Sequence, residues 1–471
     1  MDKFDCIIAG AGTAGCILAK KLAEAGFKVL IIDKEPQKHV GHTWEVTIEK
    51  SVFARIGLKL PDKKHWIENP EKSRFYSDKK EDYIEIDSVH DDVFNIFHKT
   101  LNQFFLNAAI KAGVFFRPNH TAKELIYAHN NIITGIKGNR KGLFGKRRFL
   151  LNSKITIDVS GISAVLRKQT PEEFMIKHKL RMQDFAYAWE AIHEMSDSHI
   201  RKLQEKLDII PGMSYSRLGK FHGYQTMHLR KNNTLCFIFS TAVTEPKEHS
   251  AHVLYKNFIN MNPVFGKFIY GGGRPIPIRR TIDTMVGNGF MCIGDSACQV
   301  IPTMGSGVAS SMYAADIASH TITEAFNKND FSREQLWSYN HKYHTKRGAI
   351  LASYDIIRRF LQSLSTKDID EIFKSGLLKN DNFVNTFSSN KIKYDIIQIL
   401  DKLIKIFSNF KLLPIGLKLI QSFGDSEKAL KIYKTYPEVF NKDEFTAWQK
   451  QTDVLFSHYR TFSKGEKETF L

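Results

Sequence analysis

Three glycines near the amino end have a spacing that suits phosphate binding. Gly10, Gly12 and Gly15 follow the apolar run FDCIIAG and precede the alanine- and leucine-rich segment TAGCILAKKLAEAG. A G-x-G-x-x-G sequence between a buried strand and a helix lets the backbone approach a pyrophosphate, and the helix supplies free amide donors. We expect Thr13 and Ala14, in the first turn of that helix, to bind the ligand together with the glycines.

An acidic residue follows the glycine loop at a suitable distance. The apolar segment KVLIID predicts a second buried strand that ends in Asp33, 18 residues after Gly15. An acid about 20 residues after such a loop hydrogen-bonds a ribose hydroxyl. Together with the neighbouring Lys34, these features predict a dinucleotide site, either for NAD or for FAD. The alternative is a glycine-rich turn in an α/β protein that binds no nucleotide.

A second glycine-rich stretch, GDSACQVIPTMGSG, combines an acidic residue with a turn that has few bulky side chains. Asp295 follows the apolar segment FMCIG, which predicts a buried strand. Pro302, Gly305, Ser306 and Gly307 then lead into SGVASSMYAADIASHTITEAF, which predicts a long helix with small residues for close packing. The amino end of a helix stabilises negative charge, such as that of a reduced flavin. The alternative is a turn capped by an aspartate before an ordinary helix.

The order G-D, then P-x-x-G-x-G, resembles the C-terminal FAD motif of the para-hydroxybenzoate-hydroxylase-like flavoprotein superfamily. The resemblance implies that Asp295 bonds the ribityl chain of FAD. It also implies that the turn from Gly305 to Gly307 presents backbone amides to the pyrimidine edge of the flavin. The segment DVSGISAVLRK, from Asp158 to Lys168, resembles the superfamily motif that closes the central sheet near the pyrophosphate.

The segment VFNIFHKTLNQFFLNAAIKAGVFF resembles a further superfamily motif. His98 stands where the superfamily has an arginine that touches the cofactor, and Asn102 stands where it has an aspartate. The resemblance implies that His98 substitutes as a weaker donor to FAD. The alternative is a surface histidine on an amphipathic helix.

The layout as a whole is most similar to the geranylgeranyl reductase family, which saturates isoprenoid double bonds on lipids. The resemblance covers roughly residues 1 to 345 and includes KFHGYQTMHLRKNNTLCFIFSTAV, which resembles a segment of the family's substrate domain. Thr226 replaces the tryptophan typical of that segment, and the family's cysteine-containing turn is absent from KHVGHTWEV. Flavin halogenases carry W-x-W-x-I-P, which no tryptophan here forms, and Cys298 stands where aromatic hydroxylases usually have a histidine.

The resemblance implies an FAD-dependent oxidoreductase that reduces prenyl double bonds by hydride transfer from reduced flavin. Cys298 and Tyr224 are candidates for the proton donor, and the electron donor is NAD(P)H or ferredoxin. One alternative is a flavin-dependent monooxygenase or another FAD oxidoreductase. Another is a protein of the same fold that binds a prenyl lipid without redox chemistry.

The expected fold class is α/β, with a Rossmann-like FAD-binding domain, an inserted antiparallel-sheet substrate domain and a C-terminal helical region. The FAD-binding domain is discontinuous and is expected over 1–60, 88–168 and 281–327. The substrate domain is expected over 61–87 and 169–280, with strands in FAYAWEAIHEM, FHGYQTMHLR and TLCFIFSTAV. Residues 328–471 are expected to be helical, because they show no strand pattern.

The composition limits the kinds of partner that the protein is expected to bind. The 471 residues carry a formal charge of +18, which suggests an anionic lipid surface, phosphorylated small molecules or nucleic acid. Nucleic acid is disfavoured because the basic residues do not alternate with regularly spaced aromatic side chains. None of the five cysteines forms a C-x-x-C pair, so neither a disulfide framework nor a metal site is expected.

The segment from 396 to 423 is apolar and basic together, with Lys402, Lys405, Lys411 and Lys418 between apolar residues. This pattern predicts a pair of helices, broken at Pro414, that lie on an anionic membrane. It equally suits core helices whose lysines face water. The chain enters a strand at once and has no apolar run of about 18 residues, so we expect a cytoplasmic protein. The alternative is a protein that is peripheral on the inner face of the membrane.

Overall fold

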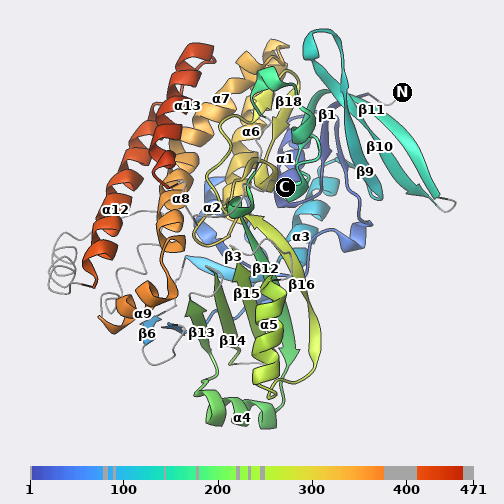
Figure 1. Ribbon diagram of the computed structural model, residues 1–471. Helices are drawn as coiled ribbons and strands as arrows, with labels where there is room; N and C mark the ends of the chain where they lie inside the picture. Colours follow the sequence, from blue (N-terminus) through green and yellow to red (C-terminus); the bar gives the residue numbers. More distant parts are fainter. Residues whose placement is uncertain are drawn as a thin grey trace.

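The computed structural model describes residues 3–77, 83–87, 92–142, 145–176, 180–218, 223–231, 235–243, 250–375 and 411–459. Within these ranges the strands form three sheets, and the carboxyl-terminal helices stand beside them (Figure 1). The expected class, a Rossmann-like α/β domain with an antiparallel-sheet insert and a helical C-terminal region, is confirmed.

The first sheet has eight strands and a parallel centre. Its path is β17 (Val286–Gly287), β18 (Phe290–Cys292), β11 (Gly145–Asp158), β1 (Lys3–Ala9), β2 (Val29–Ile32) and β8 (Phe115–Arg117). The strands β9 (His120–Tyr127) and β10 (Ile133–Gly142) extend it, because β10 pairs antiparallel with β11 and β9 with β10. β1 runs parallel to β11 and β2, which is the arrangement that a buried strand, helix and second strand predict.

Four helices of the described residues pack together beside this sheet. α1 (Thr13–Glu24) contacts both α3 (His98–Lys111) and α6 (Val308–Lys328), and the short α2 (Lys50–Arg55) also contacts α6. Close packing of α6 is possible because it buries small residues completely, including Ala314, Ala315 and Ala318. α1 is followed by Gly26 at a φ of +91°, which glycine adopts without strain.

The second sheet has seven strands. Its order is β16 (Phe268–Pro277), β12 (Phe185–Glu194), β15 (Leu235–Ala242), β14 (Tyr224–Leu229), β13 (Met213–Leu218), β5 (Lys72–Tyr76) and β6 (Tyr83–Asp87). All pairs are antiparallel except β13 with β5. α5 (Ser250–Met261) packs on β12 and β15, and α4 (Asp197–Leu207) lies at the far end of this sheet (Figure 1).

A small third sheet joins the two larger ones. It contains β3 (Glu45–Glu49), β7 (Val93–Phe97) and β4 (Trp66–Ile67). Of the strands in the expected insert 61–87, β5 and β6 belong to the seven-stranded sheet, whereas β4 pairs with β7. The domain boundaries themselves stay a prediction.

The described part of the carboxyl-terminal third is helical. It contains α7 (Arg333–Tyr343), a π-helical turn (His344–Gly348), α8 (Ala349–Gln362), α9 (Thr366–Lys374), α12 (Leu413–Lys434) and α13 (Lys442–Ser457). α12 packs along α8 (Figure 1), and buried Arg280 pairs with Asp283 and donates to the hydroxyl of Tyr433 at 3.1 Å. Arg280 therefore ties α12 to the segment that returns to the eight-stranded sheet.

The segment predicted to bind a membrane, residues 396–423, is described only from residue 411 onward. Residues 396–410, with Lys402 and Lys405, lie outside the described residues. Pro414 lies in the first turn of α12, where its missing amide hydrogen costs nothing. Among the described residues, none of the helices has the length and apolar character that a membrane span needs.

Candidate active site

The glycine loop connects β1 to α1, and each glycine has a different surrounding. A side chain at Gly10, whose φ is +118°, would put its Cβ 2.2 Å from the carbonyl oxygen of Val159. A Cβ at Gly15 would lie 2.4 Å from the carbonyl oxygen of Gly10, so this glycine allows α1 to pack against the loop. A Cβ at Gly12 would meet nothing within 4 Å, so the backbone there faces open space. That open backbone fits the approach of a pyrophosphate.

A groove of about 540 Å³ runs along this loop. Residues from β1, β2, β9 and the segment after β11 line it, together with Arg274 of β16. Asp33 accepts hydrogen bonds from the amides of Ala11 (2.8 Å) and Glu35 (2.9 Å), and burial raises the pKa of its carboxyl group. Lys34 is exposed at the edge of the groove. Asp33 thus shapes the loop, and its bond to a ribose stays a prediction.

Asn102 is the residue that locks the loop, a role that sequence reasoning missed. Its side-chain amide donates to the carbonyl oxygen of Ala11 at 2.6 Å, and its Oδ1 accepts from the hydroxyl of Thr13 at 3.0 Å. The side chain is completely buried on α3. The change from the superfamily's aspartate to asparagine was the available signal, because only the amide can donate to a carbonyl.

His98 lies in the groove and is not a solvent-facing residue of an amphipathic helix. Its ring stacks on His42 with centroids 3.9 Å apart, and its Nδ1 accepts from the His42 amide at 3.3 Å. Burial and the nearby Arg274 lower the pKa of His98 to about 4, so the ring is neutral at pH 7. Contact of His98 with the cofactor stays a prediction. His42 and Arg274 are groove residues that sequence reasoning did not single out.

Asp158 organises the far wall of the groove. It is fully buried at the end of β11, and its carboxylate accepts from the amides of Ser160 (2.9 Å), Leu166 (2.9 Å) and Arg167 (2.7 Å). These bonds fold the chain back so that Val159 and its neighbours line the groove. The DVSG segment therefore lies beside the glycine loop, as its motif predicts.

The second glycine-rich stretch forms a turn directly before α6. Burial raises the pKa of Asp295 to about 6, and the positive charge of Arg274 partly opposes this shift. A Cβ at Gly307 would lie 3.3 Å from Oδ1 of Asp295, so the acid and the turn are neighbours. The amide of Gly305 donates to the carbonyl oxygen of Ile301 at 2.8 Å, so it closes the turn and does not face a ligand. The hydroxyl of Ser306 donates to the carbonyl oxygen of Thr47 at 3.4 Å.

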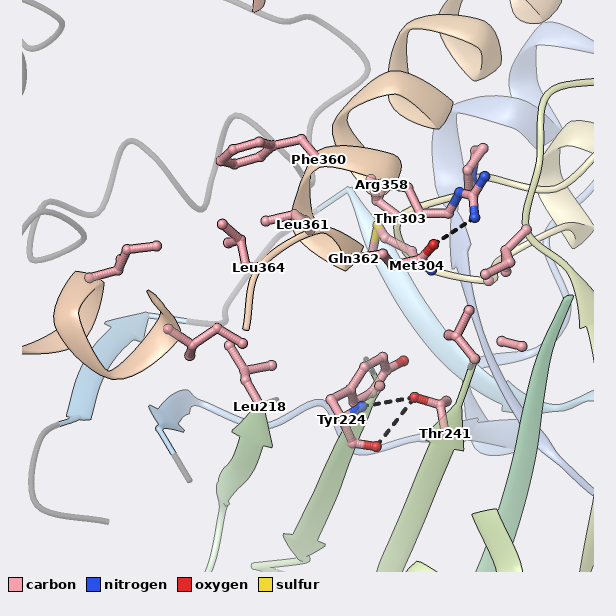
Figure 2. Close-up of a pocket in the computed structure, with 18 of the residues that line it drawn as sticks. Leu218, Tyr224, Thr241, Thr303, Met304, Arg358, Phe360, Leu361, Gln362 and Leu364 are labelled. Carbon is pink, nitrogen blue, oxygen red and sulfur yellow. Dashed lines mark hydrogen bonds between the residues drawn. The ribbon is translucent and has the colours of Figure 1, made fainter. Parts of the chain in front are cut away.

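A separate apolar cavity of about 280 Å³ borders this turn. Pro302 and Gly305 line it, and most of its wall consists of aliphatic and aromatic side chains. Figure 2 shows Leu218, Tyr224 and Thr241 of the seven-stranded sheet on one side, and Phe360, Leu361 and Leu364 from the end of α8 on the other. The cavity therefore lies between the sheet and the C-terminal helices.

The two candidate proton donors have different access to this cavity. Tyr224 lines it, and burial raises the pKa of its hydroxyl to about 12. Cys298 is fully buried in the core, holds a left-handed backbone with a φ of 56° and lies in the wall of neither cavity within the described residues. Burial raises the pKa of its thiol to about 11. Of the two, Tyr224 alone has access to the space that a substrate would fill.

The described end of the segment from 396 to 423 also reaches the cavity. Leu412, Ile415 and Leu419 line its wall, whereas Leu417 and Ile420 are 54% and 43% exposed. The amphipathic pattern of this segment therefore reflects a cavity-lining face and an exposed apolar face on the same helix.

Comparison with known proteins agrees with this geometry. Residues 5–76 match the family described as "FAD binding domain". The chain is 24% identical over 465 residues to the digeranylgeranylglycerophospholipid reductase of Sulfolobus acidocaldarius, which covers 97% of this chain and 98% of the relative. The resemblance to the geranylgeranyl reductase family is confirmed. FAD as the cofactor is confirmed as well.

Solved structures share the fold. The structure of a geranylgeranyl bacteriochlorophyll reductase-like protein from Thermoplasma acidophilum has a TM-score of 0.70 and 17% identity, and covers 90% of this chain and 100% of its own. The flavin-dependent brominase Bmp2 has a TM-score of 0.60 and 16% identity, and covers 90% of this chain and 99% of its own. At these identities both structures show the shared fold alone.

Proposed function

We propose that the protein is an FAD-dependent reductase that saturates isoprenoid double bonds of a prenyl lipid. Bound FAD, once reduced, supplies the hydride. The chain supplies a groove for the dinucleotide and, beside the Pro302–Gly307 turn, an apolar cavity for the substrate. The reductase from Sulfolobus acidocaldarius, whose name specifies a digeranylgeranyl glycerophospholipid, supports this class of substrate.

The observation that carries the proposal is the position of the apolar cavity. Its wall includes Pro302 and Gly305, which belong to the turn beside Asp295. The pKa of Asp295 responds to Arg274, and Arg274 lines the groove. An alkene held in the cavity would therefore meet the flavin end of FAD. An apolar wall excludes water from the reacting carbons and favours an isoprenoid chain over a polar ring.

The residues of the chain have separate tasks in this proposal. The loop at Gly12 and the amino end of α1 hold the pyrophosphate, and Asp295 holds the ribityl chain. The amino end of α6 stabilises negative charge on the reduced flavin. Phe239 and the α8 side chains hold the prenyl chain against the turn.

Filling the cavity tests the proposal. We expect Val243→Trp, on the cavity wall, to abolish anaerobic reduction of geranylgeranyl lipids by the photoreduced enzyme while FAD content stays normal. Val253→Trp is the matched control, because Val253 is 44% exposed on α5. If photoreduced wild-type protein ignores prenyl lipids and instead uses oxygen to hydroxylate a phenol, the protein is a monooxygenase.

We further propose that the electron donor is NAD(P)H or a ferredoxin, and that the protein binds a membrane surface peripherally. Anaerobic bleaching of bound FAD by each donor in turn distinguishes the two sources of electrons. Membrane contact is supported by Leu417, Lys418 and Ile420, which are exposed on the same helix that lines the cavity with Ile415 and Leu419. A lipid could then enter the cavity directly from the bilayer.

A further inference from the structure

Glu190 is a buried acid on the sheet face that borders the apolar cavity. It is 1% exposed on β12, four residues after the cavity-lining Ala186. Side chains of a strand alternate between faces, so both residues lie on the same face. Phe239, which also lines the cavity, is the directly opposed residue on β15. Opposed residues of an antiparallel pair have Cβ atoms about 5 Å apart. The side chain of Glu190 therefore lies directly beside Phe239 of the cavity wall.

The carboxyl group of Glu190 binds the backbone two residues away from the cofactor groove. Its Oε1 and Oε2 accept from the amide of Glu45, at 3.0 and 3.3 Å. Glu45 comes two residues after Thr43, which lines the cofactor groove. Between them, Trp44 packs edge-on against Phe239 with centroids 5.9 Å apart. Glu190 therefore lies between Phe239 of the cavity wall and the segment that follows Thr43 of the groove.

The surroundings hold this acid in its neutral form. Burial raises the pKa of Glu190 to about 9. Three charged or titratable neighbours lie here among the described residues: Glu45, Arg230 and Tyr270. Glu45 and Arg230 form a buried ion pair, and the pKa of Tyr270 responds to both Glu190 and Arg230. Because Arg230 is already paired, it does not force Glu190 to ionise. A carboxylic acid kept neutral by an apolar site can donate a proton at pH 7.

We propose that Glu190 is the proton donor of the alkene reduction. This inference rests on the proposed function. A hydride from the reduced flavin adds to one alkene carbon and the proton of the Glu190 carboxyl group adds to the other, so the C=C π bond and the O–H bond break and two C–H bonds form. The flavin is oxidised by two electrons, the alkene is reduced by two, and the carboxylate then takes a proton from water.

Tyr224 lines the cavity and Glu190 lies behind it, but the pKa of Glu190 suits proton donation better. Proton donors are most effective when their pKa lies near the working pH, and the hydroxyl of Tyr224 has a pKa of about 12. Ionisation of Glu190 should therefore slow the reduction as the pH rises through about 9. A tyrosine donor would keep the reaction running above that pH.

The test compares Glu190→Gln with the wild type. Glutamine keeps an oxygen that can accept from the Glu45 amide but has no acidic proton. We expect anaerobic reoxidation of the photoreduced enzyme by a geranylgeranyl lipid to slow about 100-fold or more, with unchanged FAD content. Glu194→Gln, at the exposed end of the same strand, is the matched control and should react at the wild-type rate.

A second readout does not depend on turnover. The infrared spectrum of the protein at pH 7 should contain the C=O band of a protonated carboxylic acid, which Glu190→Gln removes and Glu194→Gln retains. If Glu190→Gln does not fold, Glu190→Asp replaces it and should react slowly while keeping the loss of rate at high pH. The inference is refuted if wild type and Glu190→Gln reduce the lipid equally fast, or if the band survives the substitution. If wild-type protein reduces no prenyl lipid, the proposed function itself fails.

Discussion

Replacing Asn102 by aspartate should disable the glycine loop without changing the shape of the side chain. In the native protein the Asn102 amide donates to the carbonyl oxygen of Ala11 at 2.6 Å in a fully buried site. A carboxylate cannot donate, so Asn102→Asp leaves that carbonyl without its bond and faces it with negative charge. An unsatisfied buried partner costs about 1–3 kcal/mol, which corresponds to a loss of FAD affinity of roughly fivefold to 150-fold.

The loss of FAD affinity in Asn102→Asp should depend on pH. Burial should raise the pKa of the new carboxyl group, and the neighbouring His98, whose pKa is about 4, carries no positive charge at pH 7 to oppose this shift. A protonated aspartate can again donate to Ala11. The penalty relative to wild type is therefore small at low pH and appears as the pH rises through the raised pKa.

The assay is FAD titration of the apoprotein at several pH values, with each variant expressed as a ratio to wild type. Asn107→Asp is the matched control, because Asn107 is exposed on the same helix, and its ratio should stay near one. Equal FAD affinity of Asn102→Asp and wild type at pH 8 would refute the role given to Asn102. The same penalty at every pH would refute the electrostatic part of the reasoning.

Three further predictions concern the cofactor, the core and the surface. Asp33→Ala and Asp295→Ala should each weaken FAD binding about tenfold to a hundredfold, as measured by titration of the apoprotein. Full affinity in both variants would contradict a site that binds FAD at one end through Asp33 and at the other through Asp295. His344 is fully buried and its pKa is lowered to about 3, so the unfolded chain, with a pKa near 6.5, binds the proton first. Because of this residue, the free energy of unfolding should fall below pH 6.5, by about 2 kcal/mol at pH 5. When unfolding is measured with urea, His344→Phe should lack this part of the pH dependence. Lys411→Gln with Lys418→Gln should reduce binding to anionic liposomes at low salt, by about 1 kcal/mol per lysine at most, and leave FAD content unchanged. A wild-type protein that stays in the supernatant would refute membrane binding by this helix.

The local motifs were open to prediction because their causes are local. A tight turn, a close approach of α1 and an open backbone each depend on the absence of one side chain, so the spacing of Gly10, Gly12 and Gly15 is enough to predict them. The same holds for the strand, turn and helix around Asp295, whose apolar run and small residues specify the elements in order. The resemblance of the Asp295 stretch to a flavoprotein motif then led to FAD as the cofactor.

The side-chain partners could not be predicted, because they come from distant parts of the chain. Asn102 meets Ala11 across 91 positions, and Glu190 meets Glu45 across 145. Neither contact leaves a periodic pattern in the sequence, since each depends on how a helix or a sheet docks on the loop.

The sequence by itself determined where a dinucleotide could bind, because the required backbone conformations are written in consecutive residues. Only the tertiary structure decided what faces that site. The segment around Leu419 has the same amphipathic pattern whether it covers a membrane, a core or a cavity, and its packing against α8 made one face of it a wall of the apolar cavity. Periodicity reports that a face is apolar, whereas the neighbour that covers the face is set by the packing of the whole chain.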